Sequence, residues 1–128
     1  KVTYALEYAR YWNATIRVVS VVLKNNSEAR EKLSKNLIQV KNFITNANVE
    51  CTAELLEGEE KQTLGDFVFN YQKKVDADLI IIMNKKEELS FTNNISVTAR
   101  YIINNSQVPV MSIRPKDKRH ITRPTTAF

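Results

Sequence analysis

Helical and strand patterns alternate along this chain, and the alternation limits its fold more than any other feature. Apolar residues recur at spacings of three and four from Val2 to Trp12, which predicts an amphipathic helix. The β-branched run Ile16 to Leu23 follows and predicts a mostly buried strand. The two patterns then repeat, so that a helix precedes every strand. Strands separated by helices predict an open α/β fold, a three-layer α/β/α arrangement around a parallel sheet.

The later elements follow from the same signals. A long helix extends from Ala29 to Ala47, with Asn26 or Ser27 as its N-cap. Strict alternation over Val49 to Leu55 predicts a strand wetted on one face, which is typical of a sheet edge. The remaining elements are a helix over 64–75, an apolar strand Leu79–Met83 with both faces covered, a helix with Ile95 to Ile103 on its apolar face, and a strand over 108–113 that lies at an edge or starts at Pro109.

The first helix lacks a strand before it. A crossover helix connects two strands, and the apolar face of the segment from Lys1 to Trp12 needs a sheet to cover. We therefore expect the first strand of this domain to lie upstream of Lys1. The alternative is a four-stranded sheet that starts with a helix.

Three rare residue types exclude several kinds of site. Gly58 and Gly65 are the only glycines, so a phosphate loop built on several glycines cannot exist here. The single histidine, His120, excludes a two-histidine metal site, and the single cysteine, Cys51, excludes an internal disulfide and a multi-cysteine metal cluster. A lone cysteine fits a reducing compartment, and we expect a cytoplasmic protein.

The charge is concentrated at the C-terminus. The net charge is +5, and residues 114–123 hold five Lys/Arg against one Asp, which leaves about +1 for everything else. We interpret residues 1–115 as one domain and residues 116–128 as a solvated basic tail rather than a nucleic-acid contact. The longest apolar run, Leu79 to Met83, is far shorter than the roughly 20 residues of a membrane span.

No residue cluster predicts catalysis or a bound metal. Glu57, Glu59 and Glu60 are interpreted as a solvated acidic loop ahead of a helix. Ligands of open parallel sheets bind outside the carboxyl ends of the strands, which here means the loops after Leu23, Leu56 and Met83. The remaining candidates have structural interpretations. Asp76 and Asp78 are assigned to capping or turn chemistry, and Cys51 to a small buried hydrophobe. Tyr8 and Tyr11 form either a contact face or a partly buried one.

The element order and several local phrases resemble the universal stress protein (UspA-like) family, from Lys1 to about Pro115. No phrase is specific alone, and the resemblance rests on their order and spacing. The phrases are Ala5–Ala9 with IRVVSVV after it, Gly58 followed by a helix, Ala77–Ile82 (ADLIII), and Ala99 through Ile102 and Ile103 to Val108–Val110 with Arg114 and Pro115 closing.

The resemblance implies a five-stranded parallel sheet in the order 3-2-1-4-5, a cytoplasmic setting and homodimers that often pair through the last strand. It places the dimer interface at Val108, Val110 and Ser112. The family's first strand, which holds an adenine-contacting aspartate in nucleotide-binding members, is the one that this chain lacks, and the order places that strand at the centre.

Nucleotide-binding members of the family also have a motif spaced Gly-x2-Gly-x9-Gly-Ser/Thr after the fourth strand. Its positions fall here on Met83, Lys86, Ser96 and Val97, so all three glycines and the hydroxyl residue are replaced. The chain therefore resembles the branch that does not bind ATP. The other family-equivalent nucleotide positions are Val21, on the adenine side, and Ile82.

These observations predict a stress-response domain without enzymatic activity or cofactor, acting as a homodimer or tandem partner. The alternative is a regulatory switch that binds ATP or AMP and meets the phosphates with Lys85 and Lys86. A third hypothesis assigns DNA or an acidic partner to the basic tail.

Overall fold

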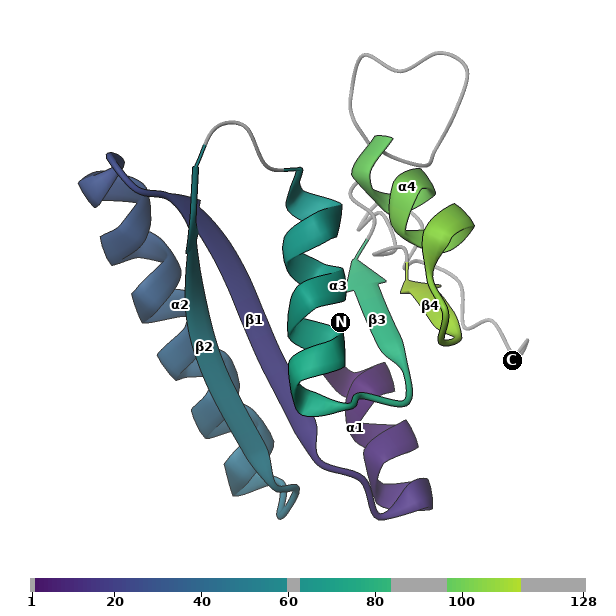
Figure 1. Ribbon diagram of the computed structural model, residues 1–128. Coiled ribbons are helices and arrows are strands. Elements are labelled where there is room, and N and C mark those ends of the chain that lie inside the picture. Colours follow the sequence, from purple (N-terminus) through teal and green to yellow (C-terminus); the bar gives the residue numbers. More distant parts are fainter. Residues whose placement is uncertain (1, 60–62, 84–96, 114–128) are drawn as a thin grey trace, which may run out of the picture. The chain divides into compact units, whose positions relative to one another are not determined.

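The computed structural model describes residues 2–59, 63–83 and 97–113 (Figure 1). Helices and strands alternate as the sequence predicts. The chain divides into two compact units, Lys1–Ala77 and Asp78–Phe128, which we call unit 1 and unit 2. Unit 1 contains α1 (Val2–Trp12), β1 (Ile16–Leu23), α2 (Ser27–Asn46), β2 (Cys51–Gly58) and α3 (Leu64–Val75), and unit 2 contains β3 (Ile80–Met83), α4 (Val97–Asn105) and β4 (Val110–Ile113).

The sheet of unit 1 is the parallel pair of β1 and β2, in register from Ile16 opposite Cys51 to Leu23 opposite Gly58. The strand predicted over 49–55 therefore begins two residues later and ends three residues later. Its start is set by β1, whose first paired residue is Ile16, opposite Cys51. Its end follows β1, which provides pairing partners as far as Leu23.

Helices cover both faces of this sheet. On the α1/α2 face, five buried residues form the core, and Ile16 and Val18 of β1 pack against them. α3 lies on the opposite face, so unit 1 has three layers (Figure 1). Burial of each large apolar side chain stabilises the fold by about 1.5–3 kcal/mol, which makes this the main stabilising layer. The core residues are Leu6, Ala9, Ile44, Val49 and Cys51.

Asparagine and aspartate mark the helix ends in unit 1. The Asn26 side chain is the N-cap of α2 and accepts a hydrogen bond from the Ala29 N–H (3.0 Å). The residues Asn13, Asn48 and Asp76 follow α1, α2 and α3 with left-handed φ values of 52°, 64° and 53°. Glycine is the usual residue for this conformation, and Asn and Asp tolerate it best among the others. The predicted capping role of Asp76 is thus confirmed.

Unit 2 contains a parallel β-α-β arrangement. β3 and β4 pair from Ile80 opposite Val110 to Met83 opposite Ile113, and the Ile80 N–H bonds to the Pro109 carbonyl (3.0 Å). β4 starts at Val110, one residue after the predicted alternative start at Pro109 and two residues after the start of the predicted range 108–113. Leu79 precedes β3 and is 37% exposed, so the prediction of a strand from 79 with both faces covered is wrong at that residue. The buried residues are Ile80, Ala99, Ile102 and Ile113.

The two strand pairs agree with the expected order. An order of 3-2-1-4-5 places the second strand beside the third and the fourth beside the fifth. The parallel pairs β1/β2 and β3/β4 are these two neighbours. Within the described residues of unit 1, no strand pairs with the other edge of β1.

Candidate functional site

The carboxyl ends of the parallel strands are the expected ligand side of an open α/β fold. In unit 1 these ends are Leu23 and Gly58, and the connection from β1 to α2 is described in full. In unit 2, Met83 and Ile113 are the last described residues before segments 84–96 and 114–128. The predicted site after Met83, with Lys85 and Lys86, therefore lies outside the described residues.

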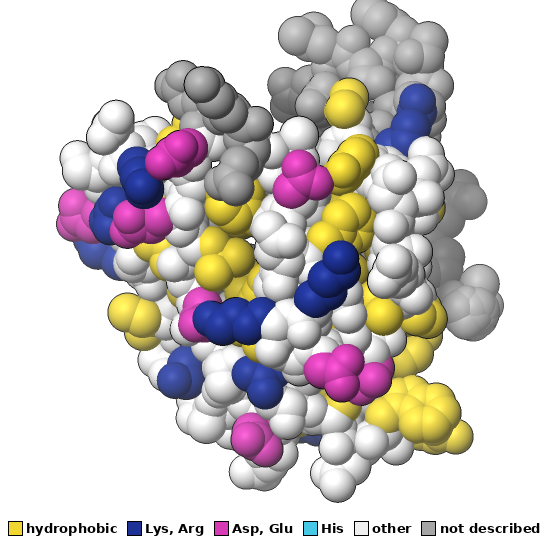
Figure 2. Space-filling view, viewed as in Figure 1, with side chains coloured by type: hydrophobic (Ala, Val, Ile, Leu, Met, Phe, Trp, Pro, Cys, Tyr) yellow, Lys and Arg dark blue, Asp and Glu magenta, His cyan; other side chains and the backbone are white. Residues whose placement is uncertain are grey.

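Two ion pairs occupy the carboxyl edge of the unit 1 sheet. The Lys24 Nζ lies 3.3 Å from a Glu59 carboxylate oxygen, and the Arg30 guanidinium contacts the Glu57 carboxylate. Figure 2 shows acidic and basic side chains interleaved at this end. The predicted solvated acidic loop is thus a strand end in which Glu57 and Glu59 are both paired with cations, while Glu60 lies outside the described residues. These pairs are exposed, so each stabilises the fold by at most about 1 kcal/mol.

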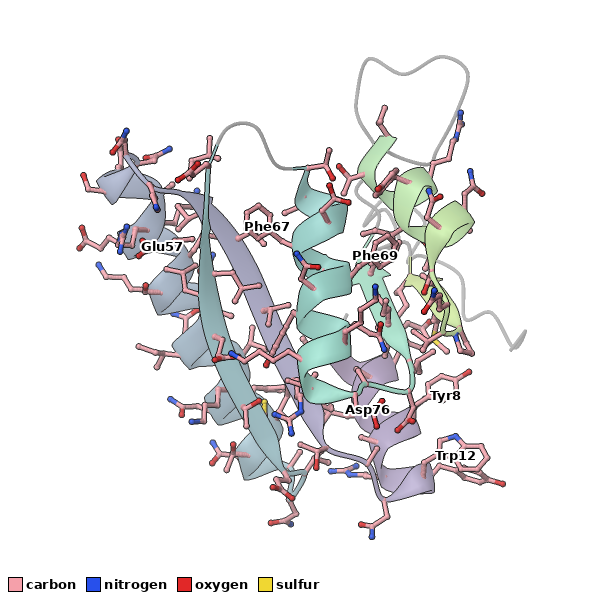
Figure 3. The ribbon with its side chains drawn as sticks, viewed as in Figure 1. Tyr8, Trp12, Glu57, Phe67, Phe69 and Asp76 are labelled. Atoms are coloured by element: carbon pink, nitrogen blue, oxygen red, sulfur yellow. The ribbon has the colours of Figure 1, made fainter. Side chains whose placement is uncertain are left out.

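Gly58 has a packing function. A Cβ atom at this position would lie 2.2 Å from Cζ of Phe67, whose ring comes from α3. Figure 3 shows the Phe67 ring between α3 and the sheet. Gly65, the other glycine, is buried within α3. Gly65 is therefore part of helix α3, and Gly58 is the residue against which α3 packs. Neither glycine lies in a phosphate-binding loop.

A polar cluster lies under α3. Tyr71 is buried, and its pKa is raised, first by burial and then by the Glu54 carboxylate, which accepts a hydrogen bond from the phenol and carries negative charge. Arg17 and Thr52, on the same sheet face, act on the pKa in the opposite direction. The sequence predicted Tyr71 only as part of an apolar helix face. The sequence did contain a signal for this polar cluster. Thr52 and Glu54 form the polar side of an alternating strand, and a buried tyrosine hydroxyl needs a hydrogen-bond partner.

Cys51 is an unreactive thiol, and the described acidic residues form no metal-binding group. Burial raises the pKa of the Cys51 thiol, and the nearby Lys41 opposes this shift, so the thiol stays protonated and inert at neutral pH. The interpretation of Cys51 as a small buried hydrophobe is confirmed. Within the described ranges there is no cluster of three metal-ligating side chains. His120 lies outside those ranges.

The residues matched to nucleotide-binding positions fall in both units. Val21 pairs with Leu56 in the unit 1 sheet and is half-buried. Ile82 and Met83 are the last two residues of β3, and Val97 begins α4 with 88% of its surface exposed. The other two matched positions, Lys86 and Ser96, lie outside the described residues.

The three residues assigned to a dimer interface differ in their backbone contacts. In the β3/β4 ladder, Met111 and Ile113 direct their N–H and C=O groups toward β3, so Val110 and Ser112 direct theirs to the opposite edge. Val108 lies before β4, and the Ser106 hydroxyl bonds to both its N–H (3.1 Å) and its C=O (2.7 Å). Among the described residues, no strand pairs with the outward-directed backbone groups of Val110 and Ser112, whereas the backbone groups of Val108 are bonded to Ser106.

Helix α1 presents aromatic side chains to solvent. Partial burial was one of the two interpretations of Tyr8 and Tyr11; Tyr8 is 42% exposed and agrees with it, whereas Tyr11 is 80% exposed and does not. Trp12, the next residue, is 70% exposed. The last two rings contact each other edge to face, with centroids 5.0 Å apart. Figure 3 shows Tyr8 and Trp12 projecting from α1.

Among the described helices, none is long and apolar enough to cross a bilayer.

Comparison with solved structures identifies the fold. A universal stress protein from Archaeoglobus fulgidus is 21% identical, with a TM-score of 0.72 over 88% of this chain and 85% of that chain. The Archaeoglobus fulgidus universal stress protein in complex with dAMP is 22% identical, with a TM-score of 0.69 over 88% and 83%. A universal stress protein in complex with cAMP is 14% identical, with a TM-score of 0.70 over 90% and 85%.

The chain therefore has the Rossmann-like α/β fold of these structures. No protein-family model matches it, and no curated protein matches it in sequence.

Proposed function

We propose that this chain is a cytoplasmic stress-response domain of the universal stress protein family. It acts by forming a homodimer or by binding a partner domain, and it does not hydrolyse ATP. The similarity in fold to universal stress protein structures, over 88% of the chain, supports the family assignment. The order of the family-like phrases in the sequence supports it independently.

The observation that argues against ATP is the placement of the glycines. A phosphate loop needs bare backbone whose N–H groups approach the ligand closely. Gly58 is packed against Phe67, and Gly65 is buried in α3. The motif positions that would hold glycine are instead Met83, Lys86 and Ser96, so the sequence does not provide the bare backbone that the motif requires.

Equilibrium dialysis of the full chain with labelled ATP and Mg²⁺ tests this proposal. We expect no retention of ATP at sub-millimolar concentrations, and no release of phosphate on prolonged incubation. Tight retention that depends on Mg²⁺ would contradict it. The buffer without Mg²⁺ is the matched control, because it separates phosphate coordination from weak stacking of adenine.

The alternative is a regulatory switch that binds an adenosine monophosphate. It is favoured by the similar structures in complex with dAMP and cAMP, ligands with one phosphate that place less demand on a glycine loop. Ligand at about 100 times its Kd would stabilise the fold by about 2.7 kcal/mol. Melting of the full chain with saturating AMP tests this function, and an unchanged Tm rules it out.

The dimer is proposed to form through the free edge of β4. Val110→Lys places a charge beside the backbone groups of Val110 and Ser112 that point away from β3, and charged residues on edge strands block pairing. We expect sedimentation equilibrium to show a dimer for the parent and a monomer for this variant. Val108→Lys is the matched control, because the Val108 backbone is bonded to Ser106. A dimer that survives Val110→Lys would place the interface elsewhere.

A further inference from the structure

The outer face of helix α1 is aromatic, and the packing of α1 within unit 1 determines which residues lie on it. Leu6 and Ala9 of this helix are buried in the core of the α1/α2 face. Three tyrosines lie two or five residues from Leu6, which at 3.6 residues per turn places them about 140–200° around the helix from it. They therefore face away from the β1/β2 sheet. These residues are Tyr4, Tyr8 and Tyr11.

The aromatic rings gather at the C-terminal end of α1. The ring planes of Tyr11 and Trp12 are 77° apart, so two ring faces stand nearly at right angles. Tyr8 precedes them by three and four residues, the spacings at which side chains on a helix are neighbours. We call these three residues the aromatic corner. Figure 3 shows that Tyr8 and Trp12 project from the same helix end.

The charges around the aromatic corner are negative. Glu7 precedes Tyr11 by four residues, is exposed, and forms no ion pair with any described residue. The nearest cation on the helix, Arg10, is turned toward α2, because its Nη2 donates to the Ala47 carbonyl (2.9 Å). The C-terminal end of a helix carries about half a negative charge, and the faces of aromatic rings are electronegative. These surroundings are complementary to a cation.

An arginine side chain fits these surroundings better than other organic cations. Its guanidinium group is planar and stacks on aromatic rings, while its N–H groups donate to carboxylate oxygens. A lysine ammonium is a compact and strongly hydrated charge, and a quaternary ammonium has no N–H group to donate. Because Tyr11 and Trp12 are largely exposed, a side chain from another protein reaches them without a change in the fold.

We propose that the aromatic corner of α1 is a docking site for an arginine side chain in an extended segment of a partner protein. The guanidinium plane stacks on the rings of Tyr11 and Trp12, and its N–H groups donate to the Glu7 carboxylate. This site is separate from the pairing proposed for β4 and does not depend on nucleotide binding.

The indole signal of Trp12 in the full ¹⁵N-labelled chain tests the proposal, because Trp12 is the only tryptophan. The probe is a short synthetic peptide of glycine and serine with arginine at its centre. Its titration should move the Trp12 Nε1–H resonance to a saturating value. The same peptide with lysine at its centre has equal charge and should bind about fivefold more weakly, because stacking is lost.

Variants of the chain separate the ring from the charge. Tyr11→Ala should weaken binding of the arginine peptide about fivefold, whereas Tyr11→Phe retains the ring and should bind as the parent does. Glu7→Gln should weaken it about threefold. Phe43→Ala is the matched control, because Phe43 is an aromatic residue of α2 that is 54% exposed, and it should leave binding unchanged.

Equal binding of the arginine and lysine peptides would overturn the proposal, as would unchanged binding to Tyr11→Ala. A third peptide, with trimethyllysine at its centre, checks the class of cation. Tighter binding of this peptide than of the arginine peptide would also overturn the proposal, because the corner would then select a cation without N–H groups.

Discussion

The two faces of the β1/β2 sheet are covered by different chemistry. The α1/α2 face is apolar, and its contacts are made by fully buried residues such as Ile44, which is 1% exposed. The α3 face combines the Phe67 ring against Gly58 with the polar surroundings of Tyr71. Hydrophobic contact is non-directional. A hydrogen bond, and an aromatic ring packed against a glycine, are formed only in a narrow range of positions and angles.

This difference indicates a division of tasks. The α1/α2 face provides most of the stability, because several side chains each contribute about 1.5–3 kcal/mol by burial. The α3 face provides less energy and fixes the position of α3. A substitution on the α1/α2 face should therefore change the free energy of unfolding strongly. A substitution on the α3 face should change the position of α3 on the sheet.

The largest effect is expected at the centre of the apolar face. Ile44→Ala should lower the free energy of unfolding by about 3–4 kcal/mol, because it removes buried methylenes and leaves a cavity beside Cys51 and Leu6. Urea unfolding followed by circular dichroism measures this loss. Ile38→Ala is the matched control on the same helix, since Ile38 is 60% exposed and should cost less than 1 kcal/mol. Equal losses in the two variants would contradict the assigned core.

A smaller effect is expected where α3 meets the end of β2. Gly58→Ala adds a methyl group 2.2 Å from Cζ of Phe67, and relief of this overlap should cost about 2 kcal/mol. The same substitution in a Phe67→Ala background should cost much less, because the overlapping ring is gone. Unfolding of the four proteins in urea completes the cycle. Additive losses would show that Gly58 is needed for some other reason.

The sequence predicts the two faces unequally, for a physical reason. Apolar periodicity identifies Leu6 and Ile44 because burial on one helix face follows directly from spacing. The partners of Tyr71 depend on which strands pair and in which register, and spacing along one helix does not contain that information. The contact of Gly58 with Phe67 likewise depends on the tertiary structure. The same holds for Val108, which the range 108–113 places within the last strand but which lies before β4 and bonds to Ser106.

The smallest effect is expected at Tyr71, and its dependence on pH distinguishes it. Tyr71→Phe removes the hydrogen bond to Glu54 and should cost about 1 kcal/mol at pH 7. The pKa of the phenol is raised in the folded protein, so the folded state favours the protonated form. Its contribution to stability is complete below the unfolded pKa of about 10 and is lost as the pH rises above that value.

The variant should therefore lose less stability than the parent between pH 9 and pH 11, while Cys51, whose pKa is also raised, contributes equally to both proteins. Urea unfolding at a series of alkaline pH values measures the two slopes. Tyr11→Phe, at an exposed position on α1, is the matched control and should follow the parent. If Tyr71→Phe also followed the parent, the phenol would be as accessible to water in the folded chain as in the unfolded one. α3 would then pack on the sheet through its apolar side chains alone, and both faces of the sheet would be covered by hydrophobic contacts.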